Sequence, residues 1–294
     1  MKRFLVVGCL IGISTIGSLS AQTSALRTYK MKTLKQAQEF FHYKGKNARI
    51  ISGHRGGMIK GFPENSIETF ENTLKYTSAF YEVDPRMTKD SVVVLMHDAT
   101  LDRTTTGKGK ISDHTFAELQ QLRLKDPEGN VTNFRIPTLM DAIKWSKGKT
   151  ILNLDNKGVP YEIIYKIIKE SGNPLVMLTI HNPEQARFYL DQNPEILFSV
   201  HILSKKAFDA YEAAGIPWKN MIAYIGPKFT PENKELLKLL HSKGVMCMIS
   251  AAPTTDKLTD KKERAGGYRA IFAEGADILE SDLPIEVAAA IKNK

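Results

Sequence analysis

Cysteine and long apolar runs are both scarce in this chain. Its 294 residues include two cysteines, Cys9 and Cys247, so no disulfide framework organises the fold. The apolar stretch from Phe4 to Ile16 is too short to span a bilayer as a lasting anchor. No Gly-x-Gly-x-x-Gly motif follows a predicted strand, which argues against dinucleotide binding. Repeats and low-complexity tracts are also missing, so we expect one large domain.

Acidic residues are outnumbered by basic ones. Lys and Arg total 41 against 32 Asp and Glu, which gives a formal net charge of +9. The basic residues are scattered, with no basic–aromatic stripe and no nucleic-acid motif, so we predict no nucleic-acid partner. Such an excess is typical of a solvated basic surface, although it would also attract anionic substrates or membrane surfaces.

The first residues have the form of an export signal. Lys2-Arg3 supplies a charged start, Phe4 to Ile16 an apolar run, and Ser18 to Ala21 small residues for cleavage. We predict a signal peptide over residues 1–21 and an exported protein, periplasmic or secreted. No integral membrane segment is expected after processing.

The rest of the chain predicts a barrel. A lead-in over residues 22–47, with a short helix near Leu34 to Phe41, precedes strands that alternate with amphipathic helices. Asn65-Ser66-Ile67-Glu68 is interpreted as a capping box at the start of one helix. Alternation indicates a parallel sheet, and the number of repeats favours closure. We therefore predict an α/β fold, a (β/α)8 TIM-type barrel over residues 48–294.

Two short β-forming runs predict a β-hairpin excursion at strands 2–3 of this barrel. Phe80 to Arg86 and Val92 to His97 are joined by a turn-forming segment. If Lys89-Asp90 is a two-residue loop, Thr88 faces Ser91 across it.

That register places Glu82 opposite His97, and Asp84 opposite Leu95. Side chains alternate along a strand, so Glu82 and Asp84 share a face, and His97 joins them as a directly opposed residue. Two carboxylates and an imidazole suit a hard divalent ion with open coordination positions. The alternative is a solvated polar face of an edge hairpin, which the apolar run Val92 to Met96 makes less favourable.

His54-Arg55-Gly56 follows a predicted strand that ends at Gly53. His54 suits general acid or base chemistry, and Arg55 suits a planar clamp for phosphate. For this tripeptide alone, a capping histidine and a surface arginine are equally compatible.

Polar segments in a fixed order carry a family resemblance. They are Gly53-His54-Arg55-Gly56, Pro63-Glu64-Asn65-Ser66, Glu82-Val83-Asp84, Thr88-Lys89-Asp90, His97-Asp98, Leu101-Asp102-Arg103-Thr104-Thr105 and Ile136-Pro137-Thr138-Leu139. Their order and spacing resemble the glycerophosphodiester phosphodiesterase family, and the resemblance extends from about Ile50 to Pro284. No single segment is diagnostic, but the ordered set is specific.

The resemblance implies a metal-dependent phosphodiesterase that hydrolyses a glycerophosphodiester, its small-molecule substrate, to glycerol 3-phosphate and an alcohol. In a β/α barrel the chemistry lies at the carboxyl ends of the strands. Asp155 and Lys157 end a predicted strand, so they should meet the groups described above. We expect Glu82, Asp84 and Asp155 to hold one divalent ion, Mg²⁺ or Ca²⁺.

The remaining residues have expected roles in proton transfer and phosphate binding. We expect His54 and His97 to be a general acid/base pair, and Arg55 and Lys157 to bind the substrate's phosphoryl oxygens. His97 as a metal ligand is an open alternative. Direct attack by water and attack by a substrate hydroxyl, which would give a cyclic phosphate, are both open.

This chain departs from the family pattern in three places. Asp155 stands where the family usually has Glu, and the shorter side chain bears on metal preference. Met246 to Ser250 lacks the Trp that is common in that strand, and Leu279 to Pro284 replaces an Ile-Thr-Asp-x-Pro-like stretch. The last two changes bear on recognition of the alcohol or glycerol.

The sequence also allows two alternative functions and leaves the roles of three further residues open. A phospholipase D-like enzyme or cyclising lyase on the same barrel would need an apolar docking loop, which does not stand out. A non-catalytic binding protein for phosphorylated ligands is disfavoured by retention of both histidines.

Glu64 is either a support of the site or a loop residue near a helix start. His181 and His201, near strand ends, are interpreted as structural in preference to substrate-binding.

Export generates the first testable prediction. Mass spectrometry of protein from the native host should give an N-terminus between about Ser20 and Ala25, where the small residues expected at a cleavage site lie. A cytoplasmic chain that begins at Met1 would contradict export. A chain that begins at a lipidated Cys9 would instead indicate a lipoprotein.

Overall fold

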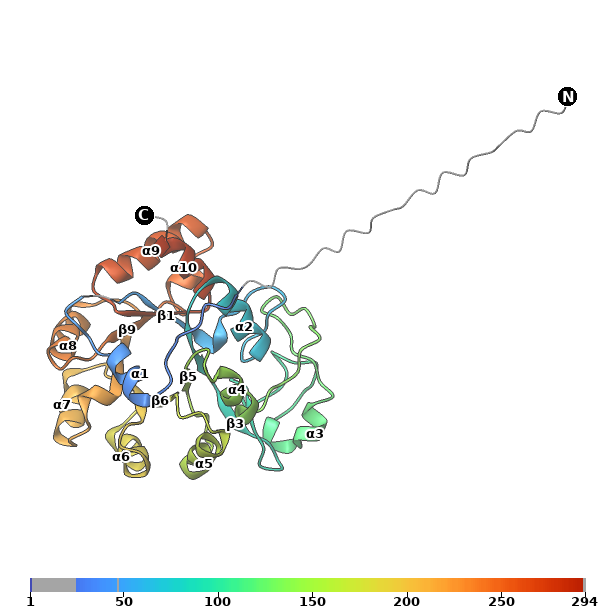
Figure 1. Ribbon diagram of the computed structural model, residues 1–294, viewed down its shortest axis with the longest axis horizontal. Helices are drawn as coiled ribbons and strands as arrows, with labels where there is room; N and C mark the ends of the chain where they lie inside the picture. Colours follow the sequence, from blue (N-terminus) through green and yellow to red (C-terminus); the bar gives the residue numbers. More distant parts are fainter. Residues whose placement is uncertain (2–24, 47, 293–294) are drawn as a thin grey trace.

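The computed structural model describes residue 1, residues 25–46 and residues 48–292; the predicted signal peptide therefore falls almost entirely outside the described residues. Within that part, eight parallel strands form a closed barrel in the order β1-β10-β9-β8-β7-β6-β5-β2. Helices α2 and α4 to α10 surround the strands, and Figure 1 shows α5 to α8 along the outside of the ring. The predicted (β/α)8 barrel is confirmed.

The barrel strands are β1 (Ile50–Gly53), β2 (Phe80–Val83), β5 (Leu152–Leu154), β6 (Val176–Ile180), β7 (Leu197–His201), β8 (Met221–Gly226), β9 (Cys247–Ser250) and β10 (Ile278–Ser281). The α-helices are α1 (Leu34–Phe40), α2 (Ile67–Tyr76), α3 (Phe116–Leu119), α4 (Leu139–Ser146), α5 (Tyr161–Ser171), α6 (Pro183–Gln192), α7 (Lys205–Ala213), α8 (Pro231–Ser242), α9 (Lys261–Ala273) and α10 (Pro284–Lys292). No helix among the described residues is long and apolar enough to cross a membrane.

The lead-in closes the end of the barrel where the strands begin. The predicted short helix is present as α1, and Leu34, Ala37 and Phe41 pack against the first inward residues of the strands, such as Phe80. The Phe41 and Phe80 rings meet edge to face, with centroids 5.5 Å apart. Figure 1 shows α1 lying over the ring of strands. This end is therefore sealed, and the carboxyl ends of the strands are left for chemistry.

The hairpin excursion is present, but its predicted register is wrong by one residue. β3 (Pro85–Met87) pairs with β4 (Val93–Leu95) with Pro85 opposite Leu95, outside the barrel sheet. The Thr88 amide donates to the Val92 carbonyl, because Ser91 adopts a left-handed φ of 63° and lengthens the loop to three residues. Met96 therefore faces Asp84, and the predicted pairing of Glu82 with His97 does not form.

Polar side chains cap the starts of several helices, and one cap differs from the predicted one. Thr138, Asn182 and Thr230 cap α4, α6 and α8. At α2 the cap is Ser66, which accepts a hydrogen bond from the Thr69 amide, whereas the capping-box interpretation placed it at Asn65. Asn65 instead has a φ of 55° and bonds to Asp84.

The packing of α1 gives a stability prediction. Phe41→Ala should lower the free energy of unfolding by about 3–5 kcal/mol, the usual effect of removing a buried aromatic ring. Lys35→Ala, at an exposed position on α1, the helix that ends just before Phe41, should change it by less than about 0.5 kcal/mol. Denaturant unfolding measures both, and equal small effects would show that α1 does not seal the barrel.

Candidate active site

Three carboxylates converge at the carboxyl ends of the barrel strands. Glu82 lies on β2, Asp84 directly follows it, and Asp155 follows β5. Each offers a ligand oxygen, and these oxygens all lie within 4.8 Å of one another. β2 and β5 are hydrogen-bonded neighbours, so the sheet itself brings together residues that lie about 70 positions apart in the sequence.

A tight turn after β1 brings His54 and Arg55 to the same place. Arg55 adopts a left-handed φ of 52°, and its backbone amide donates to Glu82 Oε2 at 3.0 Å. Gly56 follows with a φ of 91°, and a Cβ there would lie 2.3 Å from the Phe70 ring. Glycine is therefore required at this turn, which fixes the direction of the two side chains before it.

Asp84 is fully buried and held from several sides. Asn65 donates to Asp84 Oδ2 at 2.7 Å and accepts from the Asp84 amide at 3.0 Å. Lys157 Nζ lies 3.1 Å from Asp84 Oδ1 and also contacts Asp155, while Arg55 Nε lies 3.7 Å from Oδ2. Asp84 Oδ1 is at ion-pair distance from Lys157 yet has no partner in hydrogen-bond geometry.

The electrostatics of this cluster fit a cation. Burial and then the charges of Asp84, Glu280 and Asp155 raise the pKa of Glu82 well above its usual range. The pKa of Asp155 is lowered: burial opposes this, but His181 and Lys157 outweigh it. Closely spaced carboxylates, with one buried oxygen lacking a hydrogen bond, are a donor set suited to a hard divalent ion.

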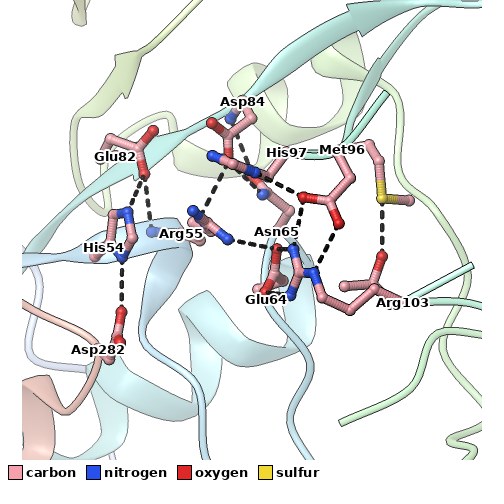
Figure 2. A network of polar contacts seen from close by, with 12 residues as sticks. His54, Arg55, Glu64, Asn65, Glu82, Asp84, Met96, His97, Arg103 and Asp282 are labelled. Carbon is pink, nitrogen blue, oxygen red and sulfur yellow. Dashed lines mark hydrogen bonds and ion pairs between the residues drawn. The ribbon is translucent and has the colours of Figure 1, made fainter. Parts of the chain in front are cut away.

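His54 forms a pair with a carboxylate that the sequence reasoning did not select. Its Nδ1 lies 2.6 Å from Asp282 Oδ1, and its Nε2 lies 4.0 Å from Glu82 Oε2 (Figure 2). Burial lowers the pKa of His54, but the bond to Asp282 and the charge of Glu280 outweigh it, so the pKa is raised. Lys257 Nζ, 3.1 Å from Asp282, holds the carboxylate in place.

His97 has a matching partner. Its Nδ1 lies 2.8 Å from Asp98 Oδ1, and Arg103 donates to both oxygens of Asp98. Arg103 also donates to both oxygens of buried Glu64, at 2.7 and 2.9 Å. Glu64 in turn accepts from Arg55 at 3.0 Å, so a continuous polar network joins the two histidine segments (Figure 2). Glu64 is thus a support of the site.

Two cavities meet at this network. One is lined by His54, Arg55, Glu64, Arg103 and Lys257, among others. The other lies in the barrel mouth and includes His54, Glu82, Asp155 and His201 in its lining. His181 lies 3.4 Å from Asp155 and forms an edge contact with His201. Burial lowers the pKa of His201 to about 4. Both histidines thus border the site, not merely the core.

A second group of possible ligands lies at the opposite end of the barrel. His241 Nε2 is 2.7 Å from Asp277, which also accepts the Cys247 backbone amide. Tyr43 from the lead-in stacks on His241 with ring centroids 3.5 Å apart. Burial raises the pKa of the Cys247 thiol well above its usual range, so this group is a neutral thiol beside a hydrogen-bonded pair.

Fold and site together define a class: a β/α-barrel enzyme whose acidic, basic and imidazole groups gather where a phosphate ester would bind. The sequence profile of the Glycerophosphoryl diester phosphodiesterase family matches residues 54–182. YhdW of Bacillus subtilis, provisionally named a glycerophosphodiester phosphodiesterase, is 37% identical over 79% of this chain and 97% of its own.

Solved structures agree. A glycerophosphoryl diester phosphodiesterase from Parabacteroides distasonis is 53% identical, with a TM-score of 0.89 over 91% of this chain and 94% of that chain. An Oleispira antarctica phosphodiesterase, solved with the product sn-glycerol-3-phosphate, shares the fold at 20% identity, with a TM-score of 0.64 over 84% of this chain and 98% of that chain. The chain belongs to the glycerophosphodiester phosphodiesterase family and is a phosphoric diester hydrolase, which confirms the resemblance seen in the sequence.

The Arg103 network predicts a pH-dependent stability. Arg103 lowers the pKa of Asp98, and it lowers that of Glu64 against an opposing effect of burial. A carboxyl group with a lowered folded-state pKa stabilises the fold above its unfolded pKa, near 4, and loses that contribution as the pH falls. At pH 7 the wild-type protein should therefore have a larger free energy of unfolding than Arg103→Met. This difference in stability should become smaller below about pH 4.

Lys60→Met is the matched control, since Lys60 pairs with exposed Glu128. It should change stability little at any pH. A gap between wild type and Arg103→Met that stays constant from pH 7 to pH 3 would show that Arg103 acts through packing alone.

Proposed function

We propose that this protein hydrolyses glycerophosphodiesters to glycerol 3-phosphate and an alcohol, with one divalent ion, Mg²⁺ or Ca²⁺, held by Glu82, Asp84 and Asp155. The observation that carries the proposal is the convergence of these three carboxylates beside two histidine–carboxylate pairs. The product in the Oleispira antarctica structure supports the choice of substrate. When bound, the ion would neutralise phosphate charge and lower the barrier to displacement at phosphorus.

Arg55 and Lys157 bind the phosphoryl oxygens in this proposal. Each already faces the carboxylate cluster: Arg55 Nε lies 3.7 Å from Asp84, and Lys157 contacts Asp84 and Asp155. A guanidinium and an ammonium fixed in this way stabilise charge that develops on the phosphate without moving far in the reaction.

His54 and His97 transfer the protons. In each ring Nδ1 is engaged by a carboxylate, Asp282 or Asp98, so Nε2 is the nitrogen left to exchange a proton with substrate or water. The carboxylate orients the imidazole ring. Paired and oriented imidazoles of this kind favour an enzyme over a non-catalytic binding protein.

Export is part of the same proposal. The charged, apolar and small-residue segments at the start of the chain support a periplasmic or secreted enzyme. Such an enzyme would act on phosphodiesters outside the cytoplasm.

The experiment that tests the function is product identification. Purified protein should convert glycerophosphocholine to glycerol 3-phosphate and choline, both detected by mass spectrometry. EDTA should abolish turnover, and added Mg²⁺ or Ca²⁺ should restore it. Turnover that is indifferent to EDTA would contradict the metal, and release of choline with a cyclic glycerophosphate in place of glycerol 3-phosphate would indicate a lyase.

The metal site gives a mutational prediction. Glu82→Ala and Asp84→Ala should each abolish activity and lower the amount of bound divalent ion, because each removes a charged ligand oxygen. Asp209→Ala, at an exposed aspartate on α7, should change neither. Full metal occupancy in both site variants, measured by mass spectrometry of dialysed protein, would contradict the assignment.

The histidines give a prediction about leaving groups. His54→Ala and His97→Ala should each reduce turnover of glycerophosphodiesters by about 100-fold or more, the usual scale of general acid/base catalysis. Bis(p-nitrophenyl) phosphate has a good leaving group that needs little protonation. The variant without the general acid should therefore recover much of its loss on this substrate, and the variant without the base should not.

Thermal unfolding of the same samples is the control. Losses of activity that follow losses of folded protein would make the histidines structural, and near wild-type rates in both variants would exclude them from catalysis.

A further inference from the structure

The barrel interior changes from apolar to polar just below its mouth. Near the starts of the strands the inward side chains are apolar, and they include Ile50, Ile151, Ile222 and Ile278. Nearer the carboxyl ends the lining is polar instead. The mouth cavity has a volume of about 220 Å³ and is lined by His54, Glu82, Asn153, Asp155, Thr179, Ser199, His201, Tyr224, Met248, Ser250 and Glu280.

Glu280 is an additional carboxyl group in this cavity. In the strand register it lies beside Ser52 of β1 and Ser250 of β9, so the three side chains share the inner face of the barrel. Ser52 Oγ donates to Glu280 Oε2 at 3.4 Å, and Ser250 lies near enough to lower the pKa of the carboxyl group. The residue is only 8% exposed.

Within the described part of the chain, Glu280 is a buried acid of the mouth that has no ion pair with a lysine or arginine, although the charge of His54 acts on it. Glu64 is paired with two arginines and Asp84 with Lys157, whereas no ion pair involving Glu280 forms among the described residues. Burial raises the pKa of Glu280. The carboxyl oxygens accept hydrogen bonds in either protonation state, as the O–H group of a hydroxyl requires of its partner.

The side chains that line the cavity indicate the chemical class of ligand that it would bind. Met248 is the apolar side chain in the lining, whereas the others offer hydroxyl, amide, imidazole, phenol or carboxyl groups. An acyl chain would leave these groups without partners at a cost, and a quaternary ammonium would lack the cage of several aromatic rings that it prefers. A small group with several hydroxyls, from glycerol to a cyclitol in size, matches both the volume and the lining.

The cavity also adjoins the reacting centre. His54, Glu82 and Asp155 belong to its lining, so a phosphate held at the carboxylate cluster would direct one of its ester substituents into the mouth. Met248, Ser250 and Glu280 come from the two strands at which this sequence departs from the family pattern. Recognition of the substituent would therefore be particular to this chain.

We propose that Glu280, flanked by Ser52 and Ser250, determines specificity by hydrogen-bonding the hydroxyls of a polyhydroxylated substituent of the phosphodiester. This proposal rests on the proposed function. Glu280 binds the substituent and takes no part in proton transfer.

Product binding tests the proposal without turnover. Calorimetry of metal-loaded protein with glycerol 3-phosphate and with inorganic phosphate compares a ligand that has hydroxyls with one that has none. Glu280→Leu should lower the affinity for glycerol 3-phosphate about tenfold, the scale of one or two lost hydrogen bonds. The affinity for inorganic phosphate should not change. Glu280→Gln, which still donates and accepts, should retain most of the affinity. Asp209→Ala, at an exposed aspartate on α7 outside the cavity, should leave the affinity for both ligands unchanged.

Kinetics give a second readout. Glu280→Leu should lower kcat/KM for glycerophosphoglycerol about tenfold, mainly through KM, and leave bis(p-nitrophenyl) phosphate unchanged. An equal loss on both substrates, or a fall in thermal stability that accounts for the loss, would overturn the proposal. A Gln variant as impaired as Leu would also overturn it, because it would show that a negative charge is what the ligand requires.

The outcomes also separate this proposal from the proposed function. Hydroxyl-dependent binding without hydrolysis of glycerophosphodiesters would refute the function and keep the site. Hydrolysis that is unaffected by Glu280→Leu would keep the function and refute the site.

Discussion

Mutual repulsion among buried carboxylates is the constraint on which the site depends. Glu82, Asp84 and Asp155 lie within 4.8 Å of one another at the mouth of the barrel. Charges this close in a buried setting destabilise the fold unless cations or hydrogen-bond donors compensate them. The structure supplies both, since Lys157 contacts two of the three and Asn65 donates to Asp84. The raised pKa of Glu82 shows that the compensation is incomplete, which is the condition under which a divalent ion would bind.

A second set of charges positions the histidines without joining the cluster. Asp282 and Asp98 each engage one imidazole through Nδ1. Each carboxylate is anchored by its own cation, Lys257 for Asp282 and Arg103 for Asp98. Because Arg103 also holds Glu64, and Glu64 holds Arg55, a displacement at one histidine segment would be transmitted to Arg55 beside the other. The site is therefore a single polar framework, and the sealed opposite end of the barrel gives it a rigid base.

The sequence predicted the parts of this account that depend on local pattern. Alternation of strands and helices predicted the barrel, and strand ends predicted that His54, Glu82, Asp84 and Asp155 would meet. The predicted hairpin register was wrong because Ser91 adopts a left-handed conformation and adds one residue to the loop. Serine does not favour that conformation, so the sequence does not indicate it. The sequence did not indicate a role for Asp282 because its partner, His54, lies 228 positions away in the chain. Such a contact follows only from closure of the barrel. The departure from the family pattern at Leu279 to Pro284 was nevertheless a sequence signal that the end of this strand differs from that of its relatives.

The central claim is that the carboxylate cluster holds one divalent ion, and anomalous diffraction tests it most directly. A crystal grown with Mn²⁺, an oxygen-preferring substitute for Mg²⁺ or Ca²⁺, should show one anomalous peak in contact with Glu82, Asp84 and Asp155. A fully occupied peak elsewhere, or none between these carboxylates at millimolar Mn²⁺, would contradict the account.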